Sequence, residues 1–132
     1  GSENRNFNRN ADETAFWRYR LDGLLGPPLT TPFVLLADAN LDPVGGDGDH
    51  AEIQALLAHP ALQDPQPVGE FPADGTQRRD TAFWRDGPGA LRVEYALPSA
   101  TLRVLDTGLI WPSADARHAI VWLDIAWPPE QR

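Results

Sequence analysis

Residues 33–36, Phe-Val-Leu-Leu, form a short apolar run with no polar residue in it. A strand that is apolar at every position is covered on both faces, whereas a half-exposed strand alternates. Apolar residues also recur at helical spacing over residues 16–25 and 50–58. The sequence therefore predicts a strand buried on both faces between two helices.

Three later segments, residues 91–97, 102–111 and 118–127, have the alternation or β-branched content of strands. We expect an interruption of the second one near Gly108. Residues 63–90 are rich in Pro, Gly and Asp without apolar periodicity, which predicts a long functional or mobile loop. The order of elements predicts a mixed α/β fold with a strand-rich C-terminus.

The amino-terminal residues are polar and rich in Asn, and residues 3–10 are expected to form a loop. Asn10 is then the predicted N-cap of the first helix, with Glu13 at the capping-box position. Gly1-Ser2 is typical of a tag remnant. We therefore treat residues 3–132 as one domain, a length that suits a single core.

Composition excludes several classes of function. The net charge of −8 argues against tight, non-specific binding of nucleic acid. The chain has no cysteine, so disulfides and thiol chemistry are ruled out. No apolar run approaches the roughly 18 residues of a membrane-spanning helix. None of these features indicates a cellular compartment.

Asp38-Ala39-Asn40 directly follows the apolar run, at a rigid strand end where α/β sheets present functional side chains. The carboxylate can orient and deprotonate a water molecule, and the carboxamide can donate to an oxygen that gains negative charge. The alternative is that Asp38 and Asn40 only begin a turn. A calcium loop that also includes Asp42 is disfavoured, because Pro43 stands where such a loop needs glycine.

His118 begins the last predicted strand, where it could contact a phosphate, transfer a proton or bind a metal, or else be a plain surface residue. An inward-facing Glu94 would need a partner, and His118 on a neighbouring strand is the natural candidate. The alternative is that Glu94 and Arg92 lie on a solvated face. Trp84 could stack on a base or sugar, or simply pack in the core.

The ordered set of motifs resembles the endonuclease/exonuclease/phosphatase family. In that family, Gly-Asp-x-Asn follows a buried strand, Arg-x-Asp-Tyr forms a later strand, and Ser-Asp-His precedes the last strand. Here the motifs read Ala37-Asp38-Ala39-Asn40, Arg92-Val93-Glu94-Tyr95 and Ala116-Arg117-His118. The similarity covers nearly the whole chain and points to a bacterial branch with runs like Leu41-Asp42-Pro43, His59-Pro60 and Leu62-Gln63-Asp64-Pro65.

The resemblance implies an α/β fold of the DNase I-like type, a four-layer sandwich of which residues 3–132 would be the C-terminal half. It implies Mg²⁺-dependent hydrolysis of phosphoesters by water, with the main metal ligand in the half that is not present. By carry-over, Asp38 would activate the water, Asn40 would stabilise the transition state, His118 would contact the phosphate and Glu94 would orient His118. The expected substrate-binding residues are Arg92, Arg117 and Trp84.

Two positions depart from the family pattern. Arg117 replaces an aspartate, which exchanges a metal ligand for a cation, and Glu94 is one methylene longer than the usual aspartate. The alternative is therefore a degenerate member that binds a phosphate-bearing ligand without cleaving it. The substrate could be nucleic acid, a phospholipid or a small phosphate ester. The chain alone is expected to be inactive and to expose a sheet face through which a homodimer could form.

Overall fold

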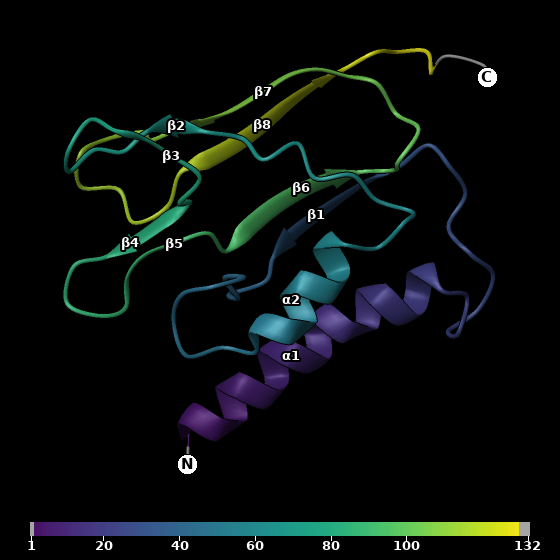
Figure 1. Cartoon of the computed structure of the whole chain (residues 1–132), viewed down its shortest axis with the longest axis horizontal. Coiled ribbons are helices and arrows are strands. Elements are labelled where there is room, and N and C mark those ends of the chain that lie inside the picture. Colours follow the sequence, from purple (N-terminus) through teal and green to yellow (C-terminus); the bar gives the residue numbers. More distant parts are fainter. Residues whose placement is uncertain (1, 130–132) are drawn as a thin grey trace.

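The computed structural model describes residues 2–129, with two helices and eight strands in that range. The helices, α1 (Ser2–Leu21) and α2 (His50–Leu57), lie together on one side of the molecule (Figure 1). The strands are β1 (Val34–Asp38), β2 (Gly69–Glu70), β3 (Gln77–Arg78), β4 (Ala82–Trp84), β5 (Gly89–Leu91), β6 (Glu94–Pro98), β7 (Val104–Ile110) and β8 (Ile120–Ile125). The predicted mixed α/β class with a strand-rich C-terminus is confirmed.

The eight strands form four antiparallel pairs. β1 pairs with β6, so that Val34 lies opposite Pro98 and Asp38 lies opposite Glu94. β7 pairs with β8, β4 with β5 and β2 with β3. β6 lies between the helices and the β7–β8 hairpin (Figure 1). An isolated bridge from Ala82 to His118 also joins β4 to the segment that leads into β8.

The main core lies between the helices and one face of the β1–β6 pair. It is built from buried residues of β1, the following loop, α2, the segment after α2, and β6: Leu35, Leu41, Ile53, Leu56, Leu62, Tyr95 and Leu97. Trp17 and Leu21 of α1 pack against it. Leu36, on the other face of β1, is 73% exposed. The prediction that β1 is buried on both faces is therefore wrong for the described residues, because the helices cover only the Leu35 face.

The amino-terminal prediction is also wrong. α1 begins at Ser2, so residues 3–10 are helical and Asn10 lies inside the helix rather than at its N-cap. The polar residues are tolerated because they lie on a solvated surface, where Arg9 and Glu13 pair one helical turn apart at 2.9 Å. α2, by contrast, has a capping side chain: Asp49 accepts the backbone N–H of Glu52 at 3.1 Å.

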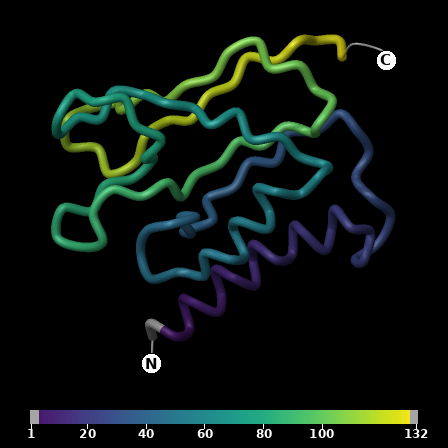
Figure 2. The backbone as a smooth tube through the Cα atoms, in the orientation of Figure 1, coloured from purple at the N-terminus to yellow at the C-terminus, as the bar shows by residue number. Residues whose placement is uncertain are grey.

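Residues 63–90 are not a plain loop, because they contain β2, β3, β4 and the start of β5 and supply a second apolar cluster. Phe71 is 3% exposed and packs edge-on against Phe83 and Trp111, at centroid distances of 5.1 and 5.7 Å. The Val68 carbonyl accepts the N–H of Leu109, so this segment lies beside β7 (Figure 2). Tertiary contacts give this segment the order that its sequence lacks.

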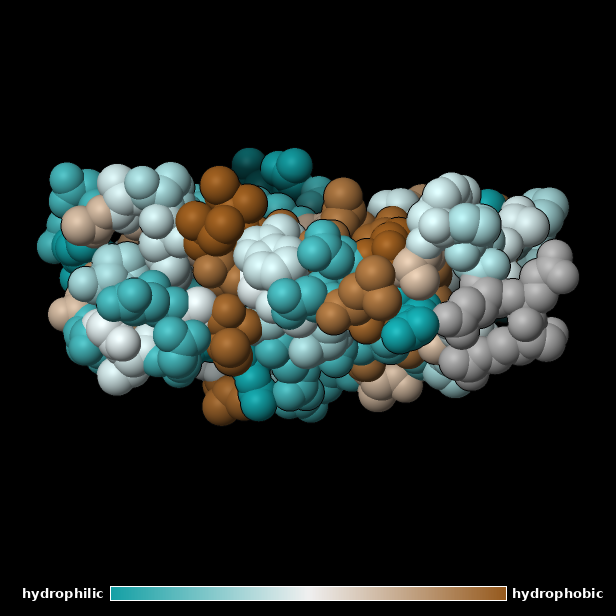
Figure 3. Space-filling view, turned by 90° about the horizontal axis from the view of Figure 1, so that it is seen from above, coloured by the Kyte–Doolittle hydropathy of each residue, from teal (hydrophilic) through white to brown (hydrophobic). Residues whose placement is uncertain are grey.

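The irregularity expected in β7 lies between Val104 and Asp106 rather than at Gly108. Gly108 has a packing role, because an added Cβ would lie 2.8 Å from the ring of Trp122. The described part of the chain contains no helix that is long and apolar enough to cross a bilayer. Viewed from above, the molecule shows separate apolar patches between polar regions (Figure 3).

Candidate active site

Two acidic residues lie opposite each other in the strand register where β1 ends and β6 begins. Asp38 is the last residue of β1 and lies directly opposite Glu94, the first residue of β6. Directly paired residues of antiparallel strands project from the same face of the sheet. Because Leu35 points to the helices, Asp38 and Glu94 belong to the face that the helices leave uncovered.

The third residue of the candidate site is His118, in the segment before β8. We call Asp38, Glu94 and His118 the cluster. The Nδ1 of His118 contacts the carboxylate Oε1 of Glu94, so the predicted partnership of Glu94 and His118 is present. An ionised carboxylate only accepts hydrogen bonds, so Nδ1 carries the proton and Nε2 is left for another partner. The His118 side chain is 41% exposed and that of Glu94 is 19% exposed. The pair therefore offers an oriented imidazole to solvent.

Asn40 lies two residues beyond the strand end, in a left-handed conformation with φ of 52°. Asparagine is one of the few residues that tolerate this conformation, which an ordinary side chain adopts at a cost of roughly 1–2 kcal/mol. The preceding N–H, of Ala39, donates to the Val93 carbonyl at 2.9 Å. Asn40 lines a groove of about 850 Å³ together with Val93, Trp84 and the amino-terminal half of α1.

The loop after Asn40 is tied to the sheet by Asp42. One oxygen of the Asp42 carboxylate accepts the N–H groups of Val44 and Gly45, both at 2.7 Å, and the other accepts the N–H of Arg92 at 2.7 Å. Both oxygens of this carboxylate therefore accept hydrogen bonds from backbone amides, three in all. It is a loop anchor rather than a calcium ligand.

Tyr95 holds the same loop from inside the core. Its hydroxyl hydrogen is shared between the carbonyls of Leu41 and Arg92, at 2.6 and 2.8 Å. Burial raises the pKa of the Tyr95 hydroxyl above its ordinary value, so the group stays a donor. Asn40 is therefore followed by a loop fixed at both Leu41 and Asp42.

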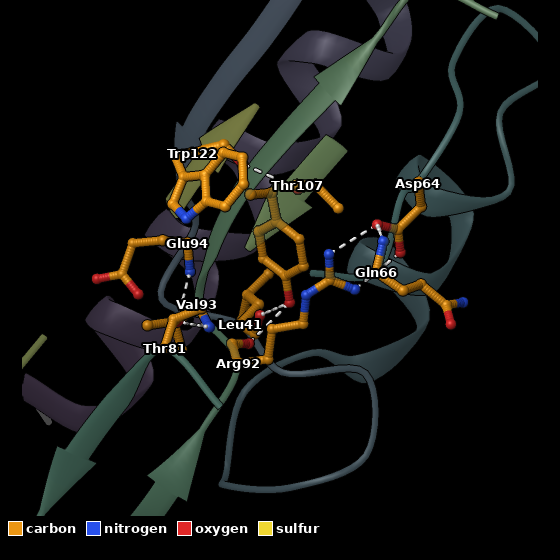
Figure 4. Close-up of polar contacts among 10 residues, drawn as sticks. Leu41, Asp64, Gln66, Thr81, Arg92, Val93, Glu94, Thr107 and Trp122 are labelled. Atoms are coloured by element: carbon orange, nitrogen blue, oxygen red, sulfur yellow. Dashed lines mark hydrogen bonds and ion pairs between the residues drawn. The ribbon is translucent and has the colours of Figure 1, made fainter. Parts of the chain in front are cut away.

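Arg92 was expected to bind substrate, but the structure does not bring it to the site. The residue is 7% exposed. Its guanidinium forms a bidentate ion pair with Asp64, with both bonds at 2.7 Å (Figure 4). The guanidinium carbon also lies 4.7 Å from the centre of the Tyr95 ring. A guanidinium that is already buried against a carboxylate is not available to a phosphate. Its role is to join the segment after α2 to the start of β6.

Trp84 and Arg117 do lie beside the cluster. The Trp84 ring is 5.7 Å from the His118 ring, edge-on at 86°. A second pocket of about 390 Å³ is lined by Trp84, Arg85, Arg117 and two acids, Asp86 and Asp115. Arg117 is exposed, and its carbonyl accepts the N–H of Phe83 at 2.8 Å.

The cluster by itself does not form a metal centre. Among residues 2–129, no group of three His, Cys, Asp or Glu side chains is arranged to hold a metal ion. One oxygen of Glu94 is taken by His118, and the other, Oε2, is buried without a hydrogen-bond partner. The residues present therefore do not fit a resident Mg²⁺ on their own.

Sequence reasoning missed the residues that support the cluster. Asp42 had a usable signal, because Asp followed by Pro and Gly is typical of a turn in which the side chain binds the backbone. Thr81 is fully buried and accepts two backbone N–H groups at the start of β6, but nothing in its local sequence marks it.

The fold is mixed α/β. At one end of the β1–β6 pair the Glu94 carboxylate contacts the His118 imidazole opposite Asp38, and Asn40 follows two residues after Asp38; these residue types are typical of hydrolytic sites. Comparison with known families agrees: the model of the endonuclease/exonuclease/phosphatase family matches residues 3–127. The chain belongs to this family, which has a DNase I-like fold and acts on phosphoesters. No curated protein and no solved structure matches the chain.

Proposed function

We propose that the chain supplies the water-activating and phosphate-contacting residues of a metal-dependent phosphoesterase. Family membership supports phosphoester chemistry. The observation that carries the assignment to particular residues is the contact between Glu94 and His118 beside the Asp38–Glu94 cross-strand pair. The contact of the Glu94 carboxylate with the His118 imidazole, opposite Asp38 in the strand register, supports this assignment.

In the proposed reaction, Asp38 orients a water molecule and takes its proton as the water oxygen attacks phosphorus. The bond from phosphorus to the leaving-group oxygen breaks, and that oxygen takes up a proton from solvent or from a nearby acid. His118 acts in this proposal as the imidazolium, whose Nε2–H donates to a phosphate oxygen while its Nδ1–H donates to Glu94. The Asn40 carboxamide donates a hydrogen bond to the oxygen on which negative charge increases.

Substrate would lie in the two pockets that flank the cluster. We assign to Trp84 the stacking of a planar or sugar group, because its ring borders both pockets. We assign to Arg117 an electrostatic contact with phosphate, since its side chain is exposed in the pocket next to His118. Nucleic acid, a phospholipid and a small phosphate ester all remain candidate substrates.

The cofactor in this proposal is Mg²⁺, which would neutralise charge on the phosphate. Because the described residues do not form a metal centre, we propose that its main ligand lies outside them and that the isolated chain has little activity. The test is hydrolysis of bis(4-nitrophenyl) phosphate by this chain and by a longer polypeptide that contains it. We expect turnover by the longer polypeptide that EDTA abolishes and that His118→Asn lowers by on the order of 10²-fold or more.

A second candidate is binding of a phosphate-bearing ligand without cleavage. Arg117, in place of a potential metal ligand, is the observation that favours it. Calorimetric titration with inorganic phosphate separates the candidates. Binding that Arg117→Ala weakens, without turnover in any metal, would support the binding protein and exclude the enzyme.

We also propose that the isolated chain forms a homodimer through the uncovered face of β1, which carries Asp38 as well and is therefore closed to substrate in the dimer. Leu36 is the exposed apolar residue at its centre. Light scattering at increasing concentration should show a dimer that Leu36→Asp converts to a monomer. A monomer at all concentrations would exclude this contact.

A further inference from the structure

Thr81 is fully buried, at 0% exposed, and lies between the two segments that carry the catalytic pair. Its backbone N–H donates to the carbonyl of Leu91, at the end of β5, at 3.0 Å. Its carbonyl accepts the N–H of Ala119, the residue after His118, at 2.7 Å. The backbone of this one residue therefore joins the β5–β6 segment to the β8 segment.

The Thr81 hydroxyl fixes the position of Glu94. It accepts the N–H of Val93 at 2.9 Å and the N–H of Glu94 at 3.1 Å (Figure 4). These two amides lie at the break between β5 and β6. The hydroxyl thus accepts the hydrogen bonds that the backbone of a neighbouring strand would otherwise accept at the first residue of β6.

The residues after Thr81 hold His118 in the same way. Ala82 forms a bridge with His118, and the N–H of Phe83 donates to the carbonyl of Arg117 at 2.8 Å. The chain on both sides of His118 is therefore bound to the segment that begins with Thr81. Glu94 and His118 are 24 residues apart in sequence, and this segment is what both of them share.

We propose that Thr81 is a positioning residue, which sets the placement of the Glu94 carboxylate relative to the His118 imidazole. This inference rests on the proposed function in treating that pair as catalytic. Thr81 does not touch substrate, and it acts only through the two residues that it places.

The rival explanation is that Thr81 only stabilises the fold, and Ser99 provides a matched control. Ser99 is also 0% exposed, and its hydroxyl also accepts a backbone N–H, that of Phe33 at 3.2 Å. It follows the last residue of β6, whereas Glu94 is the first. A purely structural effect of losing a buried hydroxyl should appear equally in Ser99→Ala.

The first experiment is ¹H NMR of the chain, which detects the His118 Nδ1 proton at low field when it is held by a carboxylate. We expect the signal in the wild type, in Thr81→Ser and in Ser99→Ala. We expect Thr81→Val, which keeps the shape but loses the hydroxyl, to broaden or lose it, as Glu94→Gln does. A folded Thr81→Val protein with an unchanged signal would overturn the inference.

A second measurement keeps the inference testable if Thr81→Val does not fold. In the wild type, the backbone N–H groups of Glu94 and Ala119 should both exchange their hydrogen slowly with solvent, at similar rates. Rapid exchange at Glu94 would show that the hydroxyl does not hold it, and would overturn the inference. Slow exchange at both positions supports it.

If a polypeptide that contains this chain hydrolyses phosphoesters, its kinetics test whether the position of Thr81 affects the reaction. Misplacement near a reacting group can cost on the order of 10²-fold in rate, so Thr81→Val should lower kcat by about that factor, with KM little changed. Thr81→Ser should restore most of kcat, and Ser99→Ala should leave it near the wild-type value. If no form hydrolyses phosphoesters, the proposed function fails, while the NMR signal still decides whether Thr81 places the pair.

Discussion

Replacing Asp64 should destabilise the protein far more than replacing an exposed acid, and the size follows from burial. Asp64 accepts two bonds of 2.7 Å from Arg92, and the side chains are 13% and 8% exposed. Asp64→Ala leaves the guanidinium buried without its partner. Removing one member of a buried ion pair costs about 3–5 kcal/mol. That is a large share of a total stability of about 5–15 kcal/mol.

The assay is urea unfolding followed by circular dichroism. With an m-value of about 1–3 kcal/mol per molar for small proteins, the midpoint should fall by about 1 M or more. Glu13→Ala is the control, because Glu13 pairs with Arg9 at 60% and 72% exposure, where an ion pair contributes about 0–1 kcal/mol. The double variant Asp64→Leu with Arg92→Met should recover much of the loss, since it leaves no buried charge unpaired.

The result also decides what Arg92 does. Equal midpoints for Asp64→Ala and Glu13→Ala would refute the argument from burial. They would indicate that Arg92 is free to move, which would reopen its predicted role in substrate binding. A large difference places Arg92 among the residues that support the Asn40 loop.

Three further outcomes are expected. Asn40→Gly should keep the stability, because glycine accepts positive φ, yet lower kcat in the phosphodiesterase assay, whereas Asn40→Ala should also lose roughly 1–2 kcal/mol on unfolding. Gly108→Ala should lose about 1–3 kcal/mol, because its Cβ would overlap the Trp122 ring. Hydrogen bonds from Thr76 lower the pKa of Asp74 to about 2, from an ordinary 3.8. The stabilisation from Asp74 should therefore be present above pH 3.8 and be lost as pH falls through about 2, with that dependence absent in Asp74→Asn.

The pattern of apolar residues predicted the elements with strong periodicity. It failed where contacts with distant parts of the chain decide the conformation. β1, α2, β7 and β8 were found because their apolar residues repeat at the period of a strand or helix. The strand predicted over residues 91–97 is divided in the structure, where β5 ends at Leu91 and β6 begins at Glu94. The start of α1 was missed, because an Asn-rich segment has weak helix propensity and turn-like composition. The strands within residues 63–90 were missed as well, since their order comes from Phe71 packing on distant aromatic residues.

The candidate site divides in the same way. The pairing of Glu94 with His118 followed from the need of a half-buried acid for a partner, and the structure contains it. The ion pair of Arg92 with Asp64 could not be predicted from the sequence. The residues around Arg92 do not show whether its side chain faces a groove or a carboxylate 28 residues away.

By itself, the sequence determined the strongly periodic elements and the residue types that stand at their ends, because these depend on period and local chemistry. Only the tertiary structure decided which of those residues meet. The reason is geometric: strand register sets Glu94 opposite Asp38, and the buried Thr81 joins the segments that carry Glu94 and His118. Register and burial are properties of the assembled chain, so no single segment encodes them.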